Sequence, residues 1–462
     1  MAKRDLNVDW KKYYEEHKGT IADAAKLIKD GDCLWLSNAS CTPYKFLDYL
    51  NEHYEEYHDV MLIYNCMNEP TDLVFNPDVK NGHFRMFSAF NLPLERVSMD
   101  MDVAECGGMS YDLFPCVIDA YNCNTAAVML CPPDEEGWCN VGAYQVCTHK
   151  PMTQDPRIEK KIGFIDPTGQ YPVPGDRETH YIHVSELDCI VDCPTELVAI
   201  PAPLSSEVDK VMADYILPYL KEGDKIQIGW GGLGEEVLNN LRGIGNVEVY
   251  SEVACETMMD LVKEGIITKI RCSSPGGCSR EFFEWASTDP RIQFLPQSEC
   301  IDALGVCPQE NIVSINSTFQ VDLIGQACSE AQGLKPYTGP GGSFAYLYGA
   351  IRSKGGRSFL CLRSTHNDSD GNPVSNVHAW MPEGCIVTTP KVFVMYVVTE
   401  YGVANVFMKT MKDRIRAIIK IAHPDYREEL KEKICTTPLI SEKDFEGIDL
   451  FDNVNKSASV NK

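Results

Sequence analysis

The chain contains no apolar run of the roughly eighteen residues that a membrane-spanning helix needs. Its first residues, MAKRDLNVDWKKYYEEHKG, include no apolar segment followed by a small-residue cleavage site. They do not have the pattern of a secretory signal. We therefore expect a cytoplasmic protein.

Positive charge is scarce. The sequence has 42 Lys and Arg against 67 Asp and Glu, a formal net charge of −25, and no long block of basic residues. Nucleic acid and anionic membranes are therefore not expected as partners, because both attract clustered cations. An anionic ligand would need local cations or backbone N–H donors. Candidate cations are Arg352, Lys354 and Arg357.

The twenty cysteines form no C-x-x-C pair, and the closest two are Cys189 and Cys193. This spacing does not fit a zinc site, so we predict no metal. The chain also lacks a G-x-S-x-G motif, which excludes the nucleophile elbow of the serine hydrolases. Thiols stay reduced in the cytoplasm, and so many of them fit a strongly reducing cell.

A chain of 462 residues exceeds the size of one hydrophobic core, so two or three domains are expected. Short β-branched or aromatic runs alternate with helical periods, which predicts an α/β fold with largely parallel sheets. These runs are MLIYN at Met61, TAAVML at Thr125, CIVDC at Cys189, VEVY at Val247, NIVSIN at Asn311, SFLCL at Ser358 and VFVMYVV at Val392.

Residues 21–38 and 211–230 share one order of features: a helix, a Lys-x-Gly-Asp turn and a strand. Gly favours the end of a helix and Asp the turn into a strand, so the match indicates two related halves or turn chemistry alone. We expect domains at 1–205 and 206–440, joined near 201–206. A last helix at 412–435 and a polar tail at 441–462 complete the prediction.

The segment 227–261, QIGWGGLGEEVLNNLRGIGNVEVYSEVACETMMDL, predicts a strand, a glycine loop, a helix and a second strand that ends before Glu252. In an open parallel sheet, loops at the carboxyl ends of neighbouring strands line one crevice. The glycines and Glu252 can therefore face the same ligand. Glycine also lets backbone N–H groups approach an anion or a developing oxyanion.

The same loop has the G-x-G-x-x-G spacing of a dinucleotide-binding turn, at Gly229, Gly231 and Gly234. Glu248 and Glu252 both lie near the position of a ribose-binding acid. An NAD-dependent oxidoreductase is therefore one interpretation. A strand-to-helix turn without a ligand is another.

Several further stretches, together with the loop, resemble the family I coenzyme A transferases. The resemblance covers nearly the whole chain from Asp9 onward. It is strongest to the 4-hydroxybutyrate and butyryl-CoA:acetate branch of the acetyl-CoA hydrolase/transferase family. The stretches are PPDEEGWCNVGAY (132–144), HVSELD (183–188), YSEVACETMMDLVKEGIIT (250–268), SINSTFQVDLIGQA (314–327), GPGGSFAYLYGAIRSKGGRSFLCLRST (339–365), VTTPKVFVMYVVTEYGVANV (387–406) and IAHPDYREEL (421–430).

The resemblance implies two tandem CoA-transferase-type open α/β domains and a homo-oligomer. It implies that coenzyme A is a substrate and that no cofactor is permanently bound. The nucleophilic glutamate falls on Glu252, and Lys354 is a candidate contact to the CoA phosphates. The residues implied for CoA binding are Gly229, Trp230, Gly231, Gly232, Leu233, Gly339, Gly341, Gly342 and Lys354.

The implied activity moves CoA between a short-chain acyl-CoA and a carboxylic acid, by ping-pong kinetics through a glutamyl-CoA thioester on Glu252. It would belong to short-chain fatty acid metabolism and fermentation. The same intermediate intercepted by water would give an acyl-CoA hydrolase, and a CoA-binding protein without turnover is a further alternative. The chain departs from the family pattern at Gln320, where an acid is usual, and at Ala345 and Tyr346, where Asp-Phe is usual.

Overall fold

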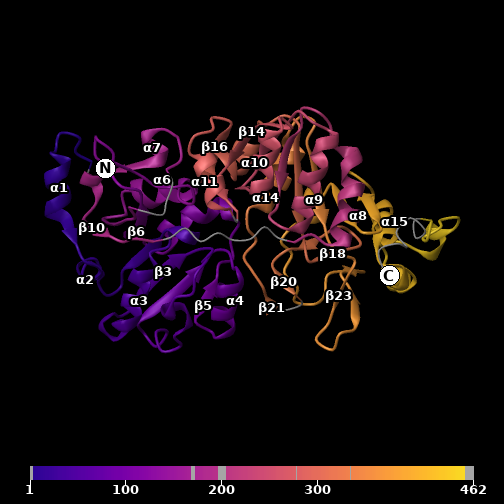
Figure 1. The fold of residues 1–462 in the computed structure, drawn as a ribbon. Coiled ribbons are helices and arrows are strands. Elements are labelled where there is room, and N and C mark those ends of the chain that lie inside the picture. Colours follow the sequence, from indigo (N-terminus) through magenta and orange to yellow (C-terminus); the bar gives the residue numbers. More distant parts are fainter. Residues whose placement is uncertain (1–3, 168–171, 196–203, 277, 333–334, 453–462) are drawn as a thin grey trace. The chain divides into compact units, whose positions relative to one another are not determined.

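The computed structural model describes residues 4–167, 172–195, 204–276, 278–332 and 335–452, which form two compact units (Figure 1). Unit 1 comprises Met1–Pro201, Val253–Glu256 and Arg271–Ile301, and unit 2 comprises Ala202–Glu252, Thr257–Ile270 and Asp302–Lys462. The division at 201/202 lies near the expected one at 205/206. The sequence did not indicate that two later segments would join unit 1. Residues 201–203 of the expected linker lie outside the described residues, and 204–206 lie within them.

Unit 1 is built on an eight-stranded sheet in which all strand pairs are parallel. Its central strands are buried along their whole length, as expected for a parallel sheet covered on both faces. In spatial order the strands are β1 (Lys18–Gly19), β10 (Cys189–Asp192), β8 (Lys160–Ile165), β6 (Thr125–Leu130), β2 (Cys33–Leu36), β3 (Val60–Tyr64), β4 (Phe84–Ser88) and β5 (Ala104–Cys106).

Polar side chains start the first two helices of unit 1. The side chain of Asp9 accepts a hydrogen bond from the Lys12 N–H, and Thr20 forms a capping box with Asp23. The helices are α1 (Trp10–His17), α2 (Ile21–Ala25), α3 (Tyr44–Glu52), α4 (Pro93–Asp100), α5 (Val117–Ala120), α6 (Val146–Gln154), α7 (Arg177–His180), α11 (Arg280–Ala286) and α12 (Gln297–Cys300). Short strands are β7 (Trp138–Asn140), β9 (Tyr181–His183), β13 (Val253–Ala254), β15 (Ser274–Pro275) and β16 (Ile292–Phe294).

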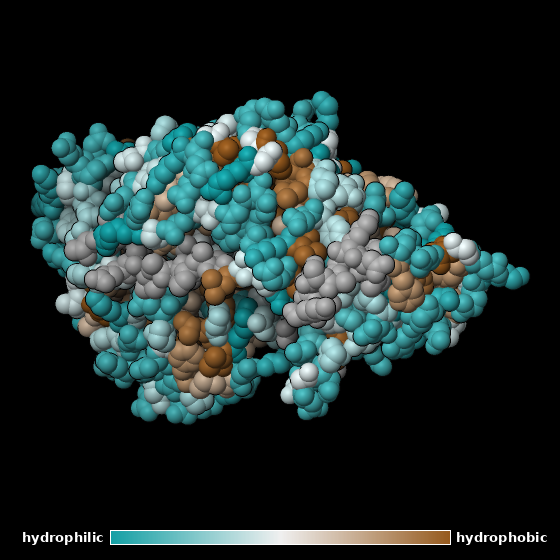
Figure 2. Space-filling view, turned by 45° about the vertical axis from the view of Figure 1, so that its right-hand side comes forward, coloured by the Kyte–Doolittle hydropathy of each residue, from teal (hydrophilic) through white to brown (hydrophobic). Residues whose placement is uncertain are grey.

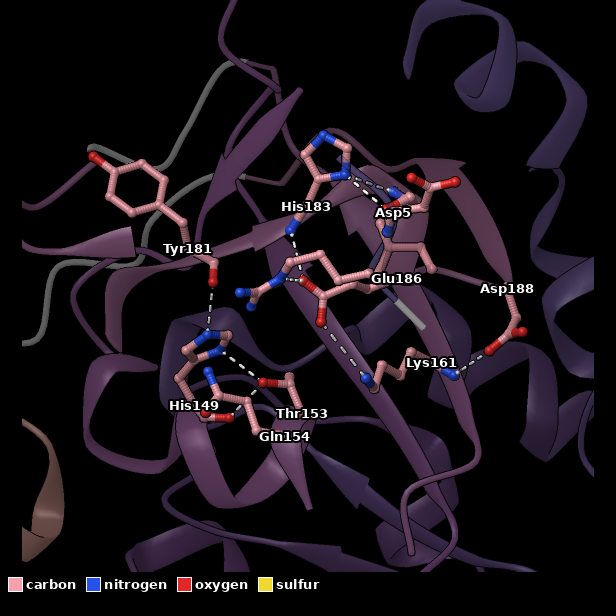
Figure 3. Close-up of polar contacts among 12 residues, drawn as sticks. Asp5, His149, Thr153, Gln154, Lys161, Tyr181, His183, Glu186 and Asp188 are labelled. Carbon is pink, nitrogen blue, oxygen red and sulfur yellow. Dashed lines mark hydrogen bonds and ion pairs between the residues drawn. The ribbon is translucent and has the colours of Figure 1, made fainter. Parts of the chain in front are cut away.

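A buried polar cluster fastens the amino-terminal segment to the sheet of unit 1 (Figure 3). The Glu186 carboxylate accepts a 2.9 Å hydrogen bond from Arg4 Nε and lies 3.8 Å from Lys161 Nζ. The main-chain N–H of Lys161 donates to Asp188 at 2.9 Å. Because each buried charge has a partner of opposite sign, we assign this cluster a structural role.

Unit 2 contains a second mostly parallel sheet, whose last strand pair is antiparallel. Across the two units, all seven runs that the sequence predicts as strands form strands. The run at Val392 begins with a 3-10 turn and becomes a strand only at Tyr396. Seven strands of this sheet are, in spatial order, β14 (Ile267–Cys272), β12 (Val247–Tyr250), β11 (Lys225–Ile228), β17 (Ile312–Ser317), β22 (Arg357–Cys361), β26 (Tyr396–Thr399) and β27 (Gly402–Asn405).

The helices of unit 2 are α8 (Glu207–Ile216), α9 (Gly232–Asn240), α10 (Glu256–Lys263), α13 (Ala303–Val306), α14 (Ser343–Arg352), α15 (Met411–Ile421) and α16 (Arg427–Cys435). Its short strands are β18 (Gln320–Asp322), β19 (Ala327–Cys328), β20 (Ala331–Gln332), β21 (Lys335–Pro336), β23 (Thr365–Asn367), β24 (Pro373–Ser375) and β25 (Val377–His378). The predicted last helix is two helices, because Pro424 cannot continue α15.

The predicted polar tail is partly wrong. Phe445 and Leu450 are buried in the core of unit 2, and the Arg427 guanidinium donates to the Leu450 carbonyl. The apolar side chains of this segment therefore contribute to the core, and the domain continues beyond residue 440. Residues 453–462 lie outside the described part.

The two sheets repeat one strand order. The series β10-β8-β6-β2-β3-β4 in unit 1 corresponds to β26-β22-β17-β11-β12-β14 in unit 2. The turns into β2 and β11 also match, because Gly31 and Gly223 have φ angles of 79° and 81°. Only glycine adopts this left-handed conformation freely. The internal echo of the sequence therefore marks two related halves.

The aspartates after these glycines make equivalent contacts. Asp32 accepts from the Lys29 N–H at 2.7 Å, and Asp224 accepts from the Lys221 N–H at 2.8 Å. Each also pairs with a cation at the start of a corresponding strand, Asp32 with Lys160 on β8 and Asp224 with Arg357 on β22. In each unit, the aspartate of the Gly-Asp turn thus also holds the start of a strand two positions away in the sheet, β8 in unit 1 and β22 in unit 2.

Hydrophilic residues predominate on the face shown in Figure 2, with apolar residues in separate patches. Exposed apolar side chains such as Leu304 and Met408 are ordinary on a protein surface. In the part of the chain that the structure describes, no helix is long and apolar enough to cross a membrane.

Candidate active site

The sheet of unit 2 has a point at which its chain connections diverge. Strand β11 leads through α9 to β12 on one side, and its neighbour β17 leads through α14 to β22 on the other. Parallel crossovers are right-handed, so α9 and α14 cover opposite faces of the sheet. Ligands of open α/β sheets bind outside the carboxyl ends of the strands at such a switch point. The candidate site is therefore at the ends of β11 and β17.

Glu252 is the second residue after the end of β12 and lies beside this point. The Ser251 hydroxyl accepts a 3.3 Å hydrogen bond from the Ile228 N–H and donates a 3.0 Å hydrogen bond to the Ile228 carbonyl. Glu252 follows Ser251 in the chain, and Gly229 follows Ile228. Burial raises the pKa of Glu252 to about 7. A carboxyl group with a strongly raised pKa in such a crevice is a candidate for chemistry.

The first glycine loop connects β11 to α9, and Gly231 caps α9 without any side chain. A Cβ atom on Gly232 would lie 2.6 Å from the Leu204 carbonyl oxygen, and one on Gly234 would lie 2.5 Å from the Ile228 side chain. A Cβ on Gly231 would meet nothing within 4 Å. Two glycines are therefore required by packing, whereas Gly231 faces open space.

The other two predicted loop residues have different environments. The Trp230 side chain is 41% exposed, whereas Leu233 is buried in the first turn of α9. Trp230 is thus accessible to a ligand, and Leu233 contributes only its backbone N–H.

The second glycine loop reaches the same edge of the sheet. Gly342 caps α14 without a side-chain hydrogen bond, and Gly341 has a left-handed φ of 64°. Helix α14 packs on β17 and β22, and after its last turn Ser353 accepts from the Ile312 N–H at the start of β17. Its first turn therefore lies at the carboxyl ends of the strands. The structure brings the predicted loops at 229–233 and 339–342 to one edge.

These two helix starts differ from other helix starts in unit 2. Helices α8 and α15 begin with Ser206 and Thr410, whose side chains accept first-turn N–H groups. At α9 and α14 the capping glycines provide no such acceptor. The first-turn N–H groups and the positive ends of both helix dipoles therefore favour an anion at the switch point, despite the net negative charge of the chain.

Lys354 is not part of this arrangement. Its carbonyl accepts from the Asn311 N–H at the amino end of β17, and its side chain is 83% exposed and pairs with Glu310 at 3.3 Å. The ten residues of α14, about 15 Å long, separate it from the second glycine loop. The predicted phosphate contact through Lys354 at this site is therefore not supported by its position. Arg352 and Arg357 also lie toward the opposite edge.

Asn316, near the end of β17, was not among the predicted site residues. Its Nδ2 donates to Gln227 Oε1 and to Ser314 Oγ at 2.8 Å each, and its Oδ1 accepts from Gln227 Nε2 at 3.1 Å. A Cβ on Gly229 would lie 3.4 Å from that Oδ1. This amide pair links the ends of β11 and β17. Its only sequence signal is a polar residue at the end of an apolar run.

A cavity of about 270 Å³ lies at the carboxyl ends of β17 and β22, beside α8. Its lining includes Arg363, a cation that the sequence analysis did not select. Gln320 also lines it, whereas Ala345 and Tyr346 are fully buried in α14. Among the departures from the family pattern, Gln320 therefore borders the cavity, whereas Ala345 and Tyr346 pack in the core.

Among the described residues, no group of three or more His, Cys, Asp or Glu side chains could hold a metal ion.

Comparisons with known proteins match these observations. Residues 278–434 match the acetyl-CoA hydrolase/transferase C-terminal domain. The chain is 27% identical over 433 residues to the 4-hydroxybutyrate coenzyme A transferase of Clostridium kluyveri, covering 92% of this chain and 98% of that one. It is 27% identical over 442 residues to the butyryl-CoA:acetate CoA-transferase of Anaerostipes caccae, covering 92% and 97%.

The crystal structure of RipA from Yersinia pestis superimposes with a TM-score of 0.80 at 24% identity, covering 94% of this chain and all of that one. This likeness bears on the fold alone. The predicted family resemblance and the predicted α/β fold with mostly parallel sheets are confirmed.

Proposed function

We propose that this chain belongs to the acetyl-CoA hydrolase/transferase family and is a CoA-transferase that moves coenzyme A between a short-chain acyl-CoA and a carboxylic acid. The printed activities of its relatives support this proposal. The structural observation that carries it is the position of Glu252 beside the glycine-capped start of α9. A carboxylate and a set of backbone N–H donors at one edge are what acyl transfer requires.

In the first half-reaction, the Glu252 carboxylate attacks the thioester carbonyl of the donor, and the carbon–sulfur bond breaks. The products are a mixed acyl-glutamyl anhydride and CoA thiolate. The thiolate then attacks the glutamyl carbonyl and expels the donor acid as a carboxylate. Glu252 is left as a glutamyl-CoA thioester, and the acceptor acid reverses these steps to form the new acyl-CoA.

Each addition places negative charge on a carbonyl oxygen. Backbone N–H groups in the first turns of α9 and α14 are the donors that we assign to this charge. Such a donor typically contributes about 3 to 4 kcal/mol to the transition state. The positive helix ends also favour the ionised form of Glu252 once the substrate has excluded water.

Two other activities could use this edge. Water in place of the acceptor acid would discharge the intermediate and give an acyl-CoA hydrolase. A dinucleotide could bind the loop at 229–234, as the G-x-G-x-x-G spacing indicates. The names of the relatives favour CoA chemistry over the second of these. We also propose a cytoplasmic homo-oligomer that acts in the short-chain fatty acid metabolism of a fermenting cell.

The test is intact-protein mass spectrometry after brief incubation with acetyl-CoA or butyryl-CoA. We expect the wild type to gain the mass of CoA less water and to lose it when a carboxylate is added. Glu252→Ala should gain nothing, whereas Glu248→Gln, an acid within β12, should behave like the wild type. If the adduct disappears in buffer alone as fast as it does after a carboxylate is added, the protein is an acyl-CoA hydrolase. No adduct with either thioester would refute the proposal.

A further inference from the structure

We propose that Cys328 and Cys385 form a reversible disulfide when a peroxide reaches this part of unit 2. Both cysteines belong to unit 2, although more than fifty residues separate them in the chain. The modification goes beyond the proposed function, because it needs neither acyl-CoA nor Glu252. A failed test of CoA transfer would therefore leave it standing.

The backbone brings the two cysteines together. Cys328 lies on β19 and is paired with Gln320 across the antiparallel β18–β19 ladder. Ala327, the other residue of β19, exchanges two main-chain hydrogen bonds of 3.0 Å with Thr389. The segment that contains Cys385 is therefore attached along β19.

The two thiols meet beside Gln320. The Cys385 thiol donates a 3.3 Å hydrogen bond to Gln320 Oε1 and is also in hydrogen-bonding contact with the Cys328 thiol. Residues paired across an antiparallel ladder point to the same face of the sheet, so Gln320 and Cys328 both face Cys385. A disulfide forms without backbone movement only where the native fold brings two cysteines this close.

The two cysteines differ in accessibility. Cys385 is half-buried, and its neighbours Glu383, Gly384 and Ile386 are exposed. Cys328 is fully buried. A small oxidant would therefore meet Cys385 first, and Cys328 is placed to attack the oxidised sulfur from the side of the protein interior.

A second pair of cysteines shows what this accessibility adds. The Cys123 thiol is in hydrogen-bonding contact with Cys33, but both residues are buried within unit 1. Such thiols pack as small apolar side chains and stay inert. The Cys33–Cys123 pair is thus a control within the same chain.

The reaction has two steps. The Cys385 thiolate attacks a peroxide oxygen, the O–O bond breaks, and Cys385 becomes a sulfenic acid while the other oxygen leaves as water. The Cys328 sulfur then attacks the Cys385 sulfur, so that an S–S bond forms and the S–O bond breaks. The hydroxyl group leaves with the proton of Cys328 as a second water. Two thiols thus lose two electrons and two protons, and hydrogen peroxide is reduced to two waters. A dithiol reverses the change by thiol–disulfide exchange.

The resting state of the pair is reduced. Burial and the nearby Cys328 thiol raise the pKa of Cys385 to about 12, so little thiolate is present at neutral pH. Oxidation therefore needs sustained peroxide. The disulfide would remove the thiol proton that Cys385 donates to Gln320 and would fasten the segment 381–390 to β19.

The test treats the reduced full-length protein with millimolar hydrogen peroxide, blocks the remaining thiols with iodoacetamide and maps disulfides by non-reducing peptide mass spectrometry. We expect a peptide pair joined through Cys328 and Cys385, lighter by two hydrogens, about 2 Da, and released by dithiothreitol. It should be at least about tenfold more abundant than a pair joined through Cys33 and Cys123. Cys385→Ser should lose this crosslink, whereas Cys116→Ser, which removes an exposed cysteine, should keep it.

Amide hydrogen exchange measures the effect on the fold. In the oxidised wild type, exchange in the segment 381–390 should slow at least about threefold, because the segment is then covalently attached to β19. The same treatment of Cys385→Ser should leave the exchange unchanged.

Absence of the Cys328–Cys385 crosslink in the oxidised wild type would overturn the inference. So would recovery of Cys385 only as a sulfinic acid, because Cys328 would then not have reached the oxidised sulfur. Equal crosslinking of Cys33 and Cys123 would also overturn it, since the oxidant would be reaching protein that has opened. All three outcomes are read from the wild type, so they do not depend on the folding of a variant.

Discussion

The Ser251 side chain holds both polar main-chain atoms of Ile228, accepting from its N–H and donating to its carbonyl. Ile228 is the last residue of β11, and Ser251 is the first residue after β12. The residues that follow them are Gly229 and Glu252. One hydroxyl thus sets the spacing between the proposed nucleophile and the glycine loop. It also explains why a serine stands at a fully buried strand end.

We predict that Ser251→Ala lowers the free energy of unfolding by about 1 to 3 kcal/mol, because two buried hydrogen bonds are lost. The rate of CoA-adduct formation should fall more than the fraction of folded protein, because Glu252 is no longer held beside the loop. Chemical denaturation and intact-mass kinetics measure the two effects.

Ser358 provides the matched control. It is a fully buried serine on β22 of the same sheet, and its hydroxyl has no hydrogen-bond partner among the described residues. Ser358→Ala should therefore change stability by less than about 1 kcal/mol and leave adduct formation unchanged. Equal loss of stability and rate in both variants would contradict the role given to Ser251.

The pKa of Glu252, raised to about 7 by burial, predicts a pH dependence. Only the ionised carboxylate attacks a thioester, so kcat/KM for adduct formation should rise between pH 6 and 8 with a midpoint of about 7. Butyryl-pantetheine is the preferred substrate, because it has no phosphate that titrates in this range. A flat profile across this interval would oppose the prediction.

The same shift affects stability. Because the folded-state pKa lies above the ordinary value of 4.5, the folded protein binds more protons than the unfolded chain between these values. The contribution of Glu252 to stability is therefore largest at low pH and is lost as the pH rises through about 7. Glu252→Gln should lack this slope. The difference between the two unfolding curves at pH 5 and pH 8 measures it.

The glycines of the first loop should separate stability from activity. Gly234→Ala places a Cβ 2.5 Å from the Ile228 side chain and 2.6 Å from the Gly229 carbonyl oxygen, so it should destabilise the protein by about 1 to 3 kcal/mol. Gly231→Ala meets no protein atom within 4 Å and should leave the melting temperature unchanged. It should still slow adduct formation at least about tenfold, because its methyl group faces the ligand. A fully active Gly231→Ala would show that no ligand approaches this loop closely.

The ion pair between Asp224 and Arg357 should be structural. Asp224 is fully buried and lies 2.5 Å from the Arg357 guanidinium, so Arg357→Met should cost about 3 to 5 kcal/mol by leaving a buried charge unpaired. Lys354→Met, three residues away, removes an exposed pair and should cost less than about 1 kcal/mol. A raised KM for acyl-CoA in Lys354→Met, without loss of stability, would restore the phosphate contact first predicted for this lysine.

Several features could be predicted because they are local. Each strand of the two sheets that was predicted came from a short β-branched run, and burial on both faces of a parallel sheet requires such runs. The Gly-Asp turns were visible because left-handed backbone selects glycine. The position of Glu252 could be predicted because it follows the strand after a glycine loop within one β-α-β segment.

Other features depend on distant partners. Lys354 follows the second glycine loop closely in sequence, but α14 carries it to the other edge of the sheet. The segment after residue 440 looked polar because its few apolar residues, among them Phe445 and Leu450, are buried only by packing on the core of unit 2. No local pattern indicated that residues 253–256 and 271–301 would join unit 1.

The α/β class, the positions of the glycines and the placement of Glu252 after a strand follow from the chemistry of neighbouring residues, so they could be predicted. The pairing of β11 with β17 could not, because more than eighty residues separate the two strands in the chain. That pairing creates the switch point, brings Asn316 to Gly229 and places the cavity within reach of Glu252. Which strands become neighbours depends on the burial of whole faces of the sheet, so no single segment of the sequence specifies it.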